Sequence, residues 1–383
     1  MKKVLCIVLV CVLWALAMSG ALAEEAVSPY DQQETIKIGC VYPLTGSKIL
    51  QGDYTGMGAN LAVKQINEAG GLLGKQVELV VEDEGDDQQT TINSYLKLAT
   101  RDDISAIVHT SITAYVLASA PYVVQYQIPT LQMSSGEECT IAGEPYMWQT
   151  RMSDHYQGTL LARYAVTELG MQKPAIVYIS NTFGQGWSAF AEEALREEFG
   201  IEPTGMFAYN DGEQQYTGIF TQALASGCDG LIVIADPATA MLITSQIHTM
   251  EIDLPMIGSA GFTNAFVIDA DPEAAEGWYA VTDWTDKVDS PASQAYVEAF
   301  EAEYGVTPEN MSVYGYDSIN IIAEAIRIAG SADPAAIQEA LFEVDIDGAM
   351  ARLSPNEHRS FSSQLYVAKI ESGTPNIVGV IDR

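Results

Sequence analysis

Basic residues are scarce in this chain. Its 383 residues include 18 Lys and Arg against 51 Asp and Glu, which gives a formal net charge of −33 at pH 7. An anionic surface of this kind repels the phosphates of nucleic acids and of anionic lipids. The imbalance therefore excludes a nucleic-acid-binding protein and gives no support to one that binds a charged membrane surface.

Histidine is also rare, and the motifs of common enzyme classes are missing. No HExxH motif or other close metal-binding pair is formed by the four histidines, His109, His155, His248 and His358. The GSAG segment at residues 258–261 is one residue short of the GxSxG motif of serine hydrolases. We therefore expect no metal site, no catalytic residues and no enzyme activity.

A glycine-rich segment at residues 44–71 reads LTGSKILQGDYTGMGANLAVKQINEAGG and follows an apolar run. It contains no GxxxxGK[ST], and Gly52, Gly56 and Gly58 do not form GxGxxG. Asp53 would compete with a phosphate for the positive end of the following helix. We therefore expect no nucleotide and no other cofactor.

One apolar run stands out, at residues 4–18, and it is too short to span a bilayer. Lys2 and Lys3 precede it, and Ala21 and Ala23 occupy the small-residue positions of a cleavage site. This pattern predicts a signal peptide at residues 1–23 and export to the periplasm. Because no Cys stands at the cleavage point, we do not expect a lipoprotein.

Cleavage after residue 23 would leave 360 residues. Because a chain of this length usually exceeds what one hydrophobic core can include, we expect two lobes. Apolar strand-like runs alternate with amphipathic helical runs in two successive series, as in a parallel α/β sheet covered on both faces. The last part of the chain predicts further helices and two edge strands added to these lobes. The cysteines that remain, Cys40, Cys139 and Cys228, allow either one disulfide with one free thiol or three buried thiols.

Several segments resemble, in order, the branched-chain amino acid (Leu/Ile/Val) binding proteins of ABC importers, which are type I periplasmic binding proteins. The segments are IKIGCVYPLTGSKILQGDYTGMGANLAVKQINEAGGLLGKQVELVVEDEGDD, IPTLQMSSGEECT, YMWQTRMSDHYQG, YISNTFGQGWSAF and YGYDS. The resemblance implies an α/β fold with two Rossmann-like lobes, three crossing strands and a ligand cleft between the lobes. It places residues 31–150 and 283–350 in the N-terminal lobe and residues 151–282 and 351–383 in the C-terminal lobe.

The same resemblance assigns ligand-binding residues in the N-terminal lobe. Gln51 takes a position that often holds an aromatic residue in the family, so the pocket is expected to be more polar there. Hydroxyl groups after the third and fourth strands would bind a ligand carboxylate. These are Ser111 or Thr113 in the first loop, with Ile112 at the family's serine position, and Ser134 and Ser135 in the second.

The resemblance implies further ligand-binding positions in the remainder of the chain. Phe183 matches a tyrosine that closes over the ligand, and Tyr316 matches an aromatic residue of the opposite wall, with Asp317 expected to cap the following helix. Ala260 stands where the family has the acid that pairs with an α-ammonium. Asp236 either replaces that acid or caps the helix that begins at Pro237.

These assignments predict a monomeric solute-binding protein that delivers an amino acid-like ligand to an inner-membrane ABC permease by hinge closure. Ala260 and Gln51 motivate an alternative ligand without an α-ammonium, such as an aromatic or aliphatic carboxylate, urea or a short amide. The cysteine pairing, the ligand and the permease stay open at the level of sequence.

Overall fold

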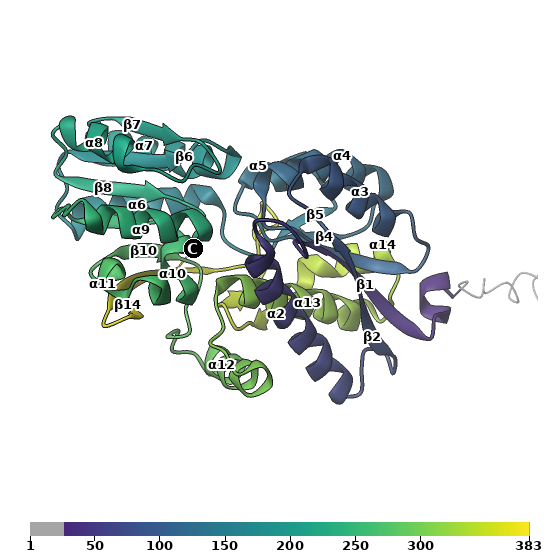
Figure 1. Ribbon diagram of the computed structural model, residues 1–383. Coiled ribbons are helices and arrows are strands. Elements are labelled where there is room, and N and C mark those ends of the chain that lie inside the picture. Colours follow the sequence, from purple (N-terminus) through teal and green to yellow (C-terminus); the bar gives the residue numbers. More distant parts are fainter. Residues whose placement is uncertain (1–26, 383) are drawn as a thin grey trace, which may run out of the picture.

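The structure, a computed structural model, describes residues 27–382, and the predicted signal peptide lies outside them. Two α/β lobes lie side by side, each built on its own sheet (Figure 1). The first lobe carries a parallel sheet in the order β2-β1-β3-β4-β5. Its strands are β1 (Thr35–Tyr42), β2 (Gln76–Asp83), β3 (Ile104–His109), β4 (Thr130–Gln132) and β5 (Met147–Gln149).

The second lobe carries a mixed sheet in the order β14-β13-β10-β9-β8-β6-β7. Its pairs are parallel from β10 to β7, whereas β13 runs antiparallel to both β10 and β14. The strands are β6 (Pro174–Ile179), β7 (Met206–Tyr209), β8 (Gly230–Ile234), β9 (Met256–Gly258), β10 (Tyr279–Thr282), β13 (Gln364–Glu371) and β14 (Thr374–Asp382). Both strands expected at the end of the chain are present, but only β14 is an edge strand, because β13 lies between β14 and β10.

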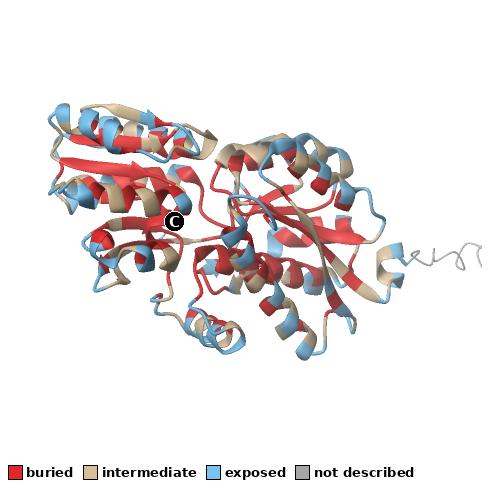
Figure 2. Ribbon diagram, in the orientation of Figure 1, coloured by how far each residue is buried: buried red, intermediate tan, exposed pale blue. Residues whose placement is uncertain are grey.

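Helices flank both sheets, and the strands between them are largely buried (Figure 2). The helices of the first half of the chain are η1 (Pro29–Gln32), α2 (Ile49–Glu68), α3 (Gln88–Ala99), α4 (Thr113–Tyr126), α5 (Glu137–Ala142), α6 (Asp154–Thr167), α7 (Thr182–Phe199) and α8 (Thr217–Ala225). Those of the second half are α9 (Pro237–Thr249), η2 (Ala260–Thr263), α10 (Ala265–Ala270), α11 (Pro272–Ala275), α12 (Pro291–Tyr304), α13 (Asn310–Ala329), α14 (Pro334–Ala340) and η3 (Leu341–Glu343).

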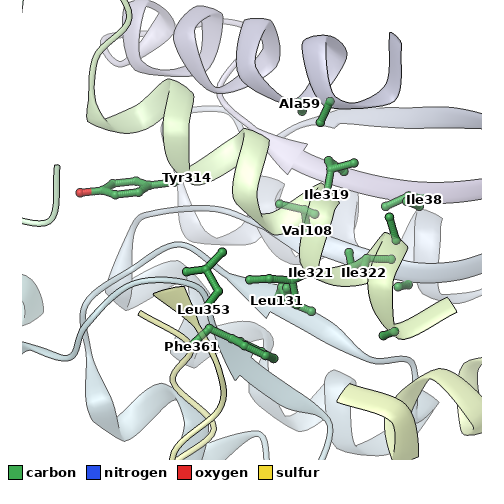
Figure 3. Packing of buried hydrophobic residues seen from close by; sticks show 14 of the residues in the cluster. Ile38, Ala59, Val108, Leu131, Tyr314, Ile319, Ile321, Ile322, Leu353 and Phe361 are labelled. Carbon is green, nitrogen blue, oxygen red and sulfur yellow. The ribbon is translucent and has the colours of Figure 1, made fainter. Parts of the chain in front are cut away.

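Helix α13 joins the first lobe although it lies far along the chain. It packs on α2, where Gly58 and Gly315 let the two backbones approach, since a Cβ atom on Gly58 would lie 1.8 Å from the carbonyl oxygen of Ser312. Its residues Ile319, Ile321 and Ile322 share one apolar cluster with the first sheet (Figure 3). This packing fixes the position of the N-terminus of α13 beside the cleft.

Three segments of the described chain pass between the lobes: residues 150–153, residues 283–290, and residues 354–363, which follow the short hairpin of β11 (Ile346–Asp347) and β12 (Arg352–Leu353). The first and third segments lie together, because the Ser362 amide donates to the Thr150 carbonyl at 3.2 Å. The Met152 amide in the first segment donates to the Asp283 carboxylate in the second at 3.3 Å. The predicted two-lobe fold is confirmed, and the exact lobe bounds stay a prediction.

The remaining expectations concern thiols and membranes. Cys40, Cys139 and Cys228 are free thiols, the first two buried, so the structure favours three thiols over a disulfide. Between residues 27 and 382 no helix combines the length and the apolar character needed to cross a bilayer.

Candidate functional site

A cavity lies between the two lobes and is lined by both of them. It contains about 830 Å³ of empty space, part of which is open to solvent. The first lobe contributes the start of α2, the loop between β3 and α4, and the N-terminus of α13. The second lobe contributes the start of α7, the loop after β7, the start of α9 and η2, and Arg151 of a crossing segment lies between them. Neither His nor Cys is among the lining residues.

Five of the predicted ligand-binding residues line this cavity. Gln51 lies on the first turn of α2, Ser111 and Thr113 lie at the start of α4, Phe183 lies at the start of α7, and Asp236 lies before α9. Because parallel strands of each sheet end at the cleft, residues that follow different strands meet there. Ile112 and Ala260 line the same cavity, as expected from their positions next to these groups.

Ser134 and Ser135 do not line the cavity, although the sequence placed them in the carboxylate site. The Ser135 hydroxyl accepts a hydrogen bond from the indole N–H of Trp187 at 2.9 Å, and its carbonyl accepts one from the Asp154 amide at 2.8 Å. The Ser134 carbonyl accepts from the Gln149 side chain at 2.9 Å. Ser135 therefore contacts the second lobe, whereas the contacts of Ser134 lie within the first lobe, with Gln132, Cys139 and Gln149.

Tyr316 also lies outside this cavity. It is more than one helical turn beyond the N-terminus of α13, and its hydroxyl donates to the Gln65 side chain on α2 at 2.7 Å. Asn310 and Met311, at the start of the helix, line the cavity instead. Asp317 does not cap a helix, since it lies inside α13 and accepts from the backbone amides of residues 349 and 350. The expected capping role of Asp317 was therefore wrong.

Asp236 is a helix cap that also lies at the cavity, and its role toward an ammonium stays a prediction. It is the N-cap of α9, and its Oδ1 accepts from the Thr239 amide at 2.9 Å, with Pro237 at the first helical position. The same side chain lines the cavity. Burial raises the pKa of this carboxyl, while its bond to the Thr239 amide and the charge of Lys48 oppose that effect.

Two polar residues that sequence reasoning did not select also line the cavity. Arg151 is 5% exposed and forms an ion pair with Asp283, and its guanidinium lies 4.7 Å from the centre of the Tyr314 ring. Asn310 reaches across the cleft, where its side-chain N–H donates to the Ala260 carbonyl at 3.5 Å. Arg151 stands within the YMWQTRMSDHYQG motif, which was a signal that could have drawn attention to it.

Charged groups of both signs border the cavity. Lys48 belongs to the first lobe and Arg151 to the crossing segment, whereas Asp211 and Asp236 belong to the second lobe. Glu84, in the loop after β2, is fully buried, and burial raises its pKa to about 8, partly offset by the charge of Lys48. Within residues 27–382, no cluster of His, Cys, Asp or Glu has the arrangement of a metal site.

Comparison with known proteins identifies the family to which this fold belongs. Residues 35–375 match the model of the family described as Periplasmic binding protein. A leucine-, isoleucine-, valine-, threonine- and alanine-binding protein of Pseudomonas aeruginosa is 24% identical over 325 residues, which cover 84% of this chain and 86% of that protein.

Solved structures show the same fold. A leucine-binding protein of Thermotoga maritima has a TM-score of 0.84 at 23% identity, covering 91% of this chain and 99% of that one. A solute-binding protein of an ABC transporter from Rhodopseudomonas palustris, in complex with 3,4-dihydroxybenzoic acid, also has a TM-score of 0.84, at 21% identity and with coverage of 91% and 98%.

Proposed function

Because this chain belongs to the periplasmic binding protein family, we propose that it captures a small amino acid-like solute and delivers it to an ABC permease in the inner membrane. The predicted signal peptide supports a location in the periplasm, and several relatives are named as binding proteins for branched-chain amino acids. As a member of a family of binding proteins, the chain has no need of covalent chemistry.

The observation that carries this proposal is the position of the cavity. Its walls come from both lobes and from a crossing segment, so a solute bound there contacts Thr113 of one lobe and Phe183 of the other. A ligand that contacts both walls favours the closed arrangement by its extra contacts in that state. This geometry supports capture by hinge closure, in which the closed form would be the species that the permease recognises.

The charges around the cavity support a zwitterionic ligand. Asp211 and Asp236 on the second lobe provide carboxylates for an ammonium group, whereas Lys48 and Arg151 provide cations for a carboxylate. A buried ammonium is costly without a carboxylate partner. Asp236 would therefore replace the acid that the family has at Ala260.

A second candidate is a ligand without an ammonium, and it rests on Ala260 and on one structural relative. Ala260 lines the cavity and offers no charge, and the Rhodopseudomonas palustris protein binds an aromatic carboxylate. In this case Asp236 would serve as a helix cap and as an acceptor for a ligand hydroxyl or amide.

A thermal-shift screen distinguishes the two candidates. The mature protein is unfolded and refolded to remove bound solute, and is then tested with aliphatic amino acids, aromatic carboxylates and short amides. A ligand at 100 times its dissociation constant adds about 2.7 kcal/mol of stability. Shifts confined to amino acids support the first candidate, and shifts confined to carboxylates or amides support the second. A ligand that binds without any decrease in the radius of gyration from solution scattering contradicts capture by closure.

A further inference from the structure

A second cavity lies at the second crossing segment and shares only Asn310 with the candidate site. It contains about 670 Å³ of empty space, part of which is open to solvent. Residues 307–310, which lead into α13, come from the first lobe, and residues 284–287 come from the crossing segment. The second lobe contributes the end of η2, helix α10 and the turn between β13 and β14. The walls of this cavity therefore belong to both lobes.

Buried acceptor oxygens without hydrogen-bond partners gather at this second cavity. Glu309 and Asn310 line it and are 4% and 3% exposed. Both carboxylate oxygens of Glu309 and Oδ1 of Asn310 have no partner. Asn264, between the lining residues Thr263 and Ala265, is 1% exposed, and both polar atoms of its side chain also lack partners. Because folded proteins contain few such atoms, their gathering at one cavity indicates a ligand that donates hydrogen bonds.

The protein itself supplies no cation to the Glu309 carboxylate. Glu309 and Ser312 are arranged as a capping box at the start of α13, where the Glu309 amide donates to the Ser312 hydroxyl at 3.1 Å. The carboxylate half of that box reaches no amide at full hydrogen-bond geometry. Its titratable neighbours are Tyr54, Tyr296 and Tyr314, and burial keeps all three neutral by raising their pKa. A cationic ligand would provide the missing partner.

The charges around the second cavity also favour a cation. Asp269 and Asp286 line it together with Glu309. Lys287 is the one cation among the lining residues, and it already pairs with Asp286. An ammonium group has three donors and no acceptor, and its hydrogen bonds to carboxylates are strengthened by charge. Because no cluster of acids within residues 27–382 has the arrangement of a metal site, these oxygens suit an organic cation better than a metal ion.

We propose that this cavity is a second binding site, separate from the solute cleft, for a small organic cation with N–H donors, such as an alkyl diamine. Glu309 and Asn310 accept hydrogen bonds from its buried end, and Asp269 lies at the exposed side of the cavity. Since its walls come from both lobes, a cation bound there stabilises the arrangement of the lobes that forms the cavity. The inference goes beyond the proposed function, because binding at this site requires no transported solute.

Two variants and a control test the assignment. Glu309→Gln keeps the shape of the side chain and removes its charge, so an ammonium loses its charged acceptor. Thr307→Lys places an ammonium of the protein at the cavity, and it carries little risk to folding because Thr307 is exposed. Glu193→Gln is the control, because Glu193 is exposed on α7, lies outside the cavity and loses the same charge.

The refolded mature protein, free of solute, is titrated calorimetrically with the cations putrescine and agmatine and with neutral 1,4-butanediol. Sodium chloride at about 0.15 M screens the exposed acids of this anionic protein. We expect the parent to bind at least one of the two cations, and to bind butanediol at least tenfold more weakly. Glu309→Gln and Thr307→Lys should each weaken the cation about tenfold or more, whereas Glu193→Gln should change its affinity less than twofold.

A proton balance distinguishes Glu309 from acids at the surface. Burial raises the pKa of Glu309 to about 8, opposed by the amide of Met311, so the free carboxyl is largely protonated at pH 7. A bound cation favours the ionised form, and Glu309 should therefore release a proton when the amine binds. Titrations at pH 7 in phosphate and in HEPES, whose ionisation enthalpies differ, measure this release. Glu309→Gln should abolish it, and Glu193→Gln should not.

The inference is overturned if neither putrescine nor agmatine binds, or if butanediol binds as tightly as the cations. An affinity unchanged in Glu309→Gln, or in Thr307→Lys if the first variant does not fold, also overturns it, because the amine is then held by the anionic surface. The proposed function is tested separately. If amines bind as expected and no solute binds in the cleft, the proposed function fails and this second site stands.

Discussion

Two loops at the same edge of the first sheet carry similar hydroxyl residues but have different surroundings. The loop after β3 brings Ser111 and Thr113 to the cavity, and the Thr113 hydroxyl has no partner. The loop after β4 brings Ser135 against the second lobe, where Trp187 donates to its hydroxyl, and the neighbouring Ser134 contacts the Cys139 thiol of the first lobe. Residue type and position after a strand therefore do not distinguish a ligand-binding hydroxyl from a structural one. What separates them is whether another part of the chain already provides the partner.

The largest expected effect concerns the polar network at the crossing segments, where Asp283 pairs with Arg151 and accepts a hydrogen bond from the Tyr314 hydroxyl. Asp283→Ala leaves the Arg151 charge buried without its carboxylate, which should lower the free energy of unfolding by about 3–5 kcal/mol. Urea unfolding measures the loss. Glu198→Ala is the control, because the exposed pair of Arg163 and Glu198 should contribute no more than about 1 kcal/mol. Equal losses in both variants would contradict the structural role of Asp283.

A pH effect sharpens the comparison at the β4 loop. The Asp154 amide donates to the Ser135 carbonyl, and burial, aided by the charge of Glu138, raises the pKa of Asp154 from 3.8 to about 7. Because the pKa of this carboxyl is higher in the folded state than in the unfolded state, its protonated form stabilises the fold. This stabilisation is fully present at a pH below the pKa of the unfolded state and is lost as the pH rises through about 7.

Asp154→Asn removes this titration. The free energy of unfolding of the variant relative to the parent should therefore increase from pH 4 to pH 8, by roughly 2–4 kcal/mol at 1.36 kcal/mol per pKa unit. Urea unfolding at both pH values measures the change, and Asp269→Asn on the exposed surface serves as a control. A constant difference between variant and parent across this range would show that Asp154 is ionised in the folded protein.

Asp236 extends the comparison to the second lobe, because it is both a helix cap and a cavity residue. If it pairs with a ligand ammonium, Asp236→Ala should weaken the binding of an amino acid by about 2 kcal/mol or more, which is roughly 30-fold. Asp87→Ala is the control, since Asp87 also caps a helix, α3, by accepting from the amide three residues later, and lies outside the cavity. Both variants should lose about 1 kcal/mol of stability as helix caps. Unchanged affinity in Asp236→Ala would leave it as a cap alone.

The fold was largely predictable from the order of apolar runs, because each strand and helix buries a face whose period is visible in the sequence. Helix starts depend on local details that the apolar periods do not show. Helix α2 begins at Ile49 with Lys48 as its N-cap, and no side-chain hydrogen bond marks that start. Helix α7 begins at Thr182, where Asn181 caps it, and the glycines of FGQG lie inside the helix.

The candidate site was predicted only in part, for a physical reason. Gln51, Thr113, Phe183 and Asp236 follow the ends of strands or begin helices, and the topology alone carries them to the cleft. Arg151 depends on a partner 132 positions later in the chain, at Asp283, which no local pattern reveals. Tyr316 depends on the rotation of α13 against α2, which is fixed by the close contact at Gly58.

The smallest expected effect tests the comparison between the two loops directly. Ser135→Ala leaves the Trp187 indole N–H buried without an acceptor, so the free energy of unfolding should decrease by at least about 1 kcal/mol. The affinity for a carboxylate ligand should change less than twofold, since Ser135 does not line the cavity. A double-mutant cycle with Trp187→Phe should show coupling between the two side chains, because either substitution breaks the same bond. Loss of carboxylate affinity with unchanged stability would reverse the assignment and return Ser135 to the ligand site.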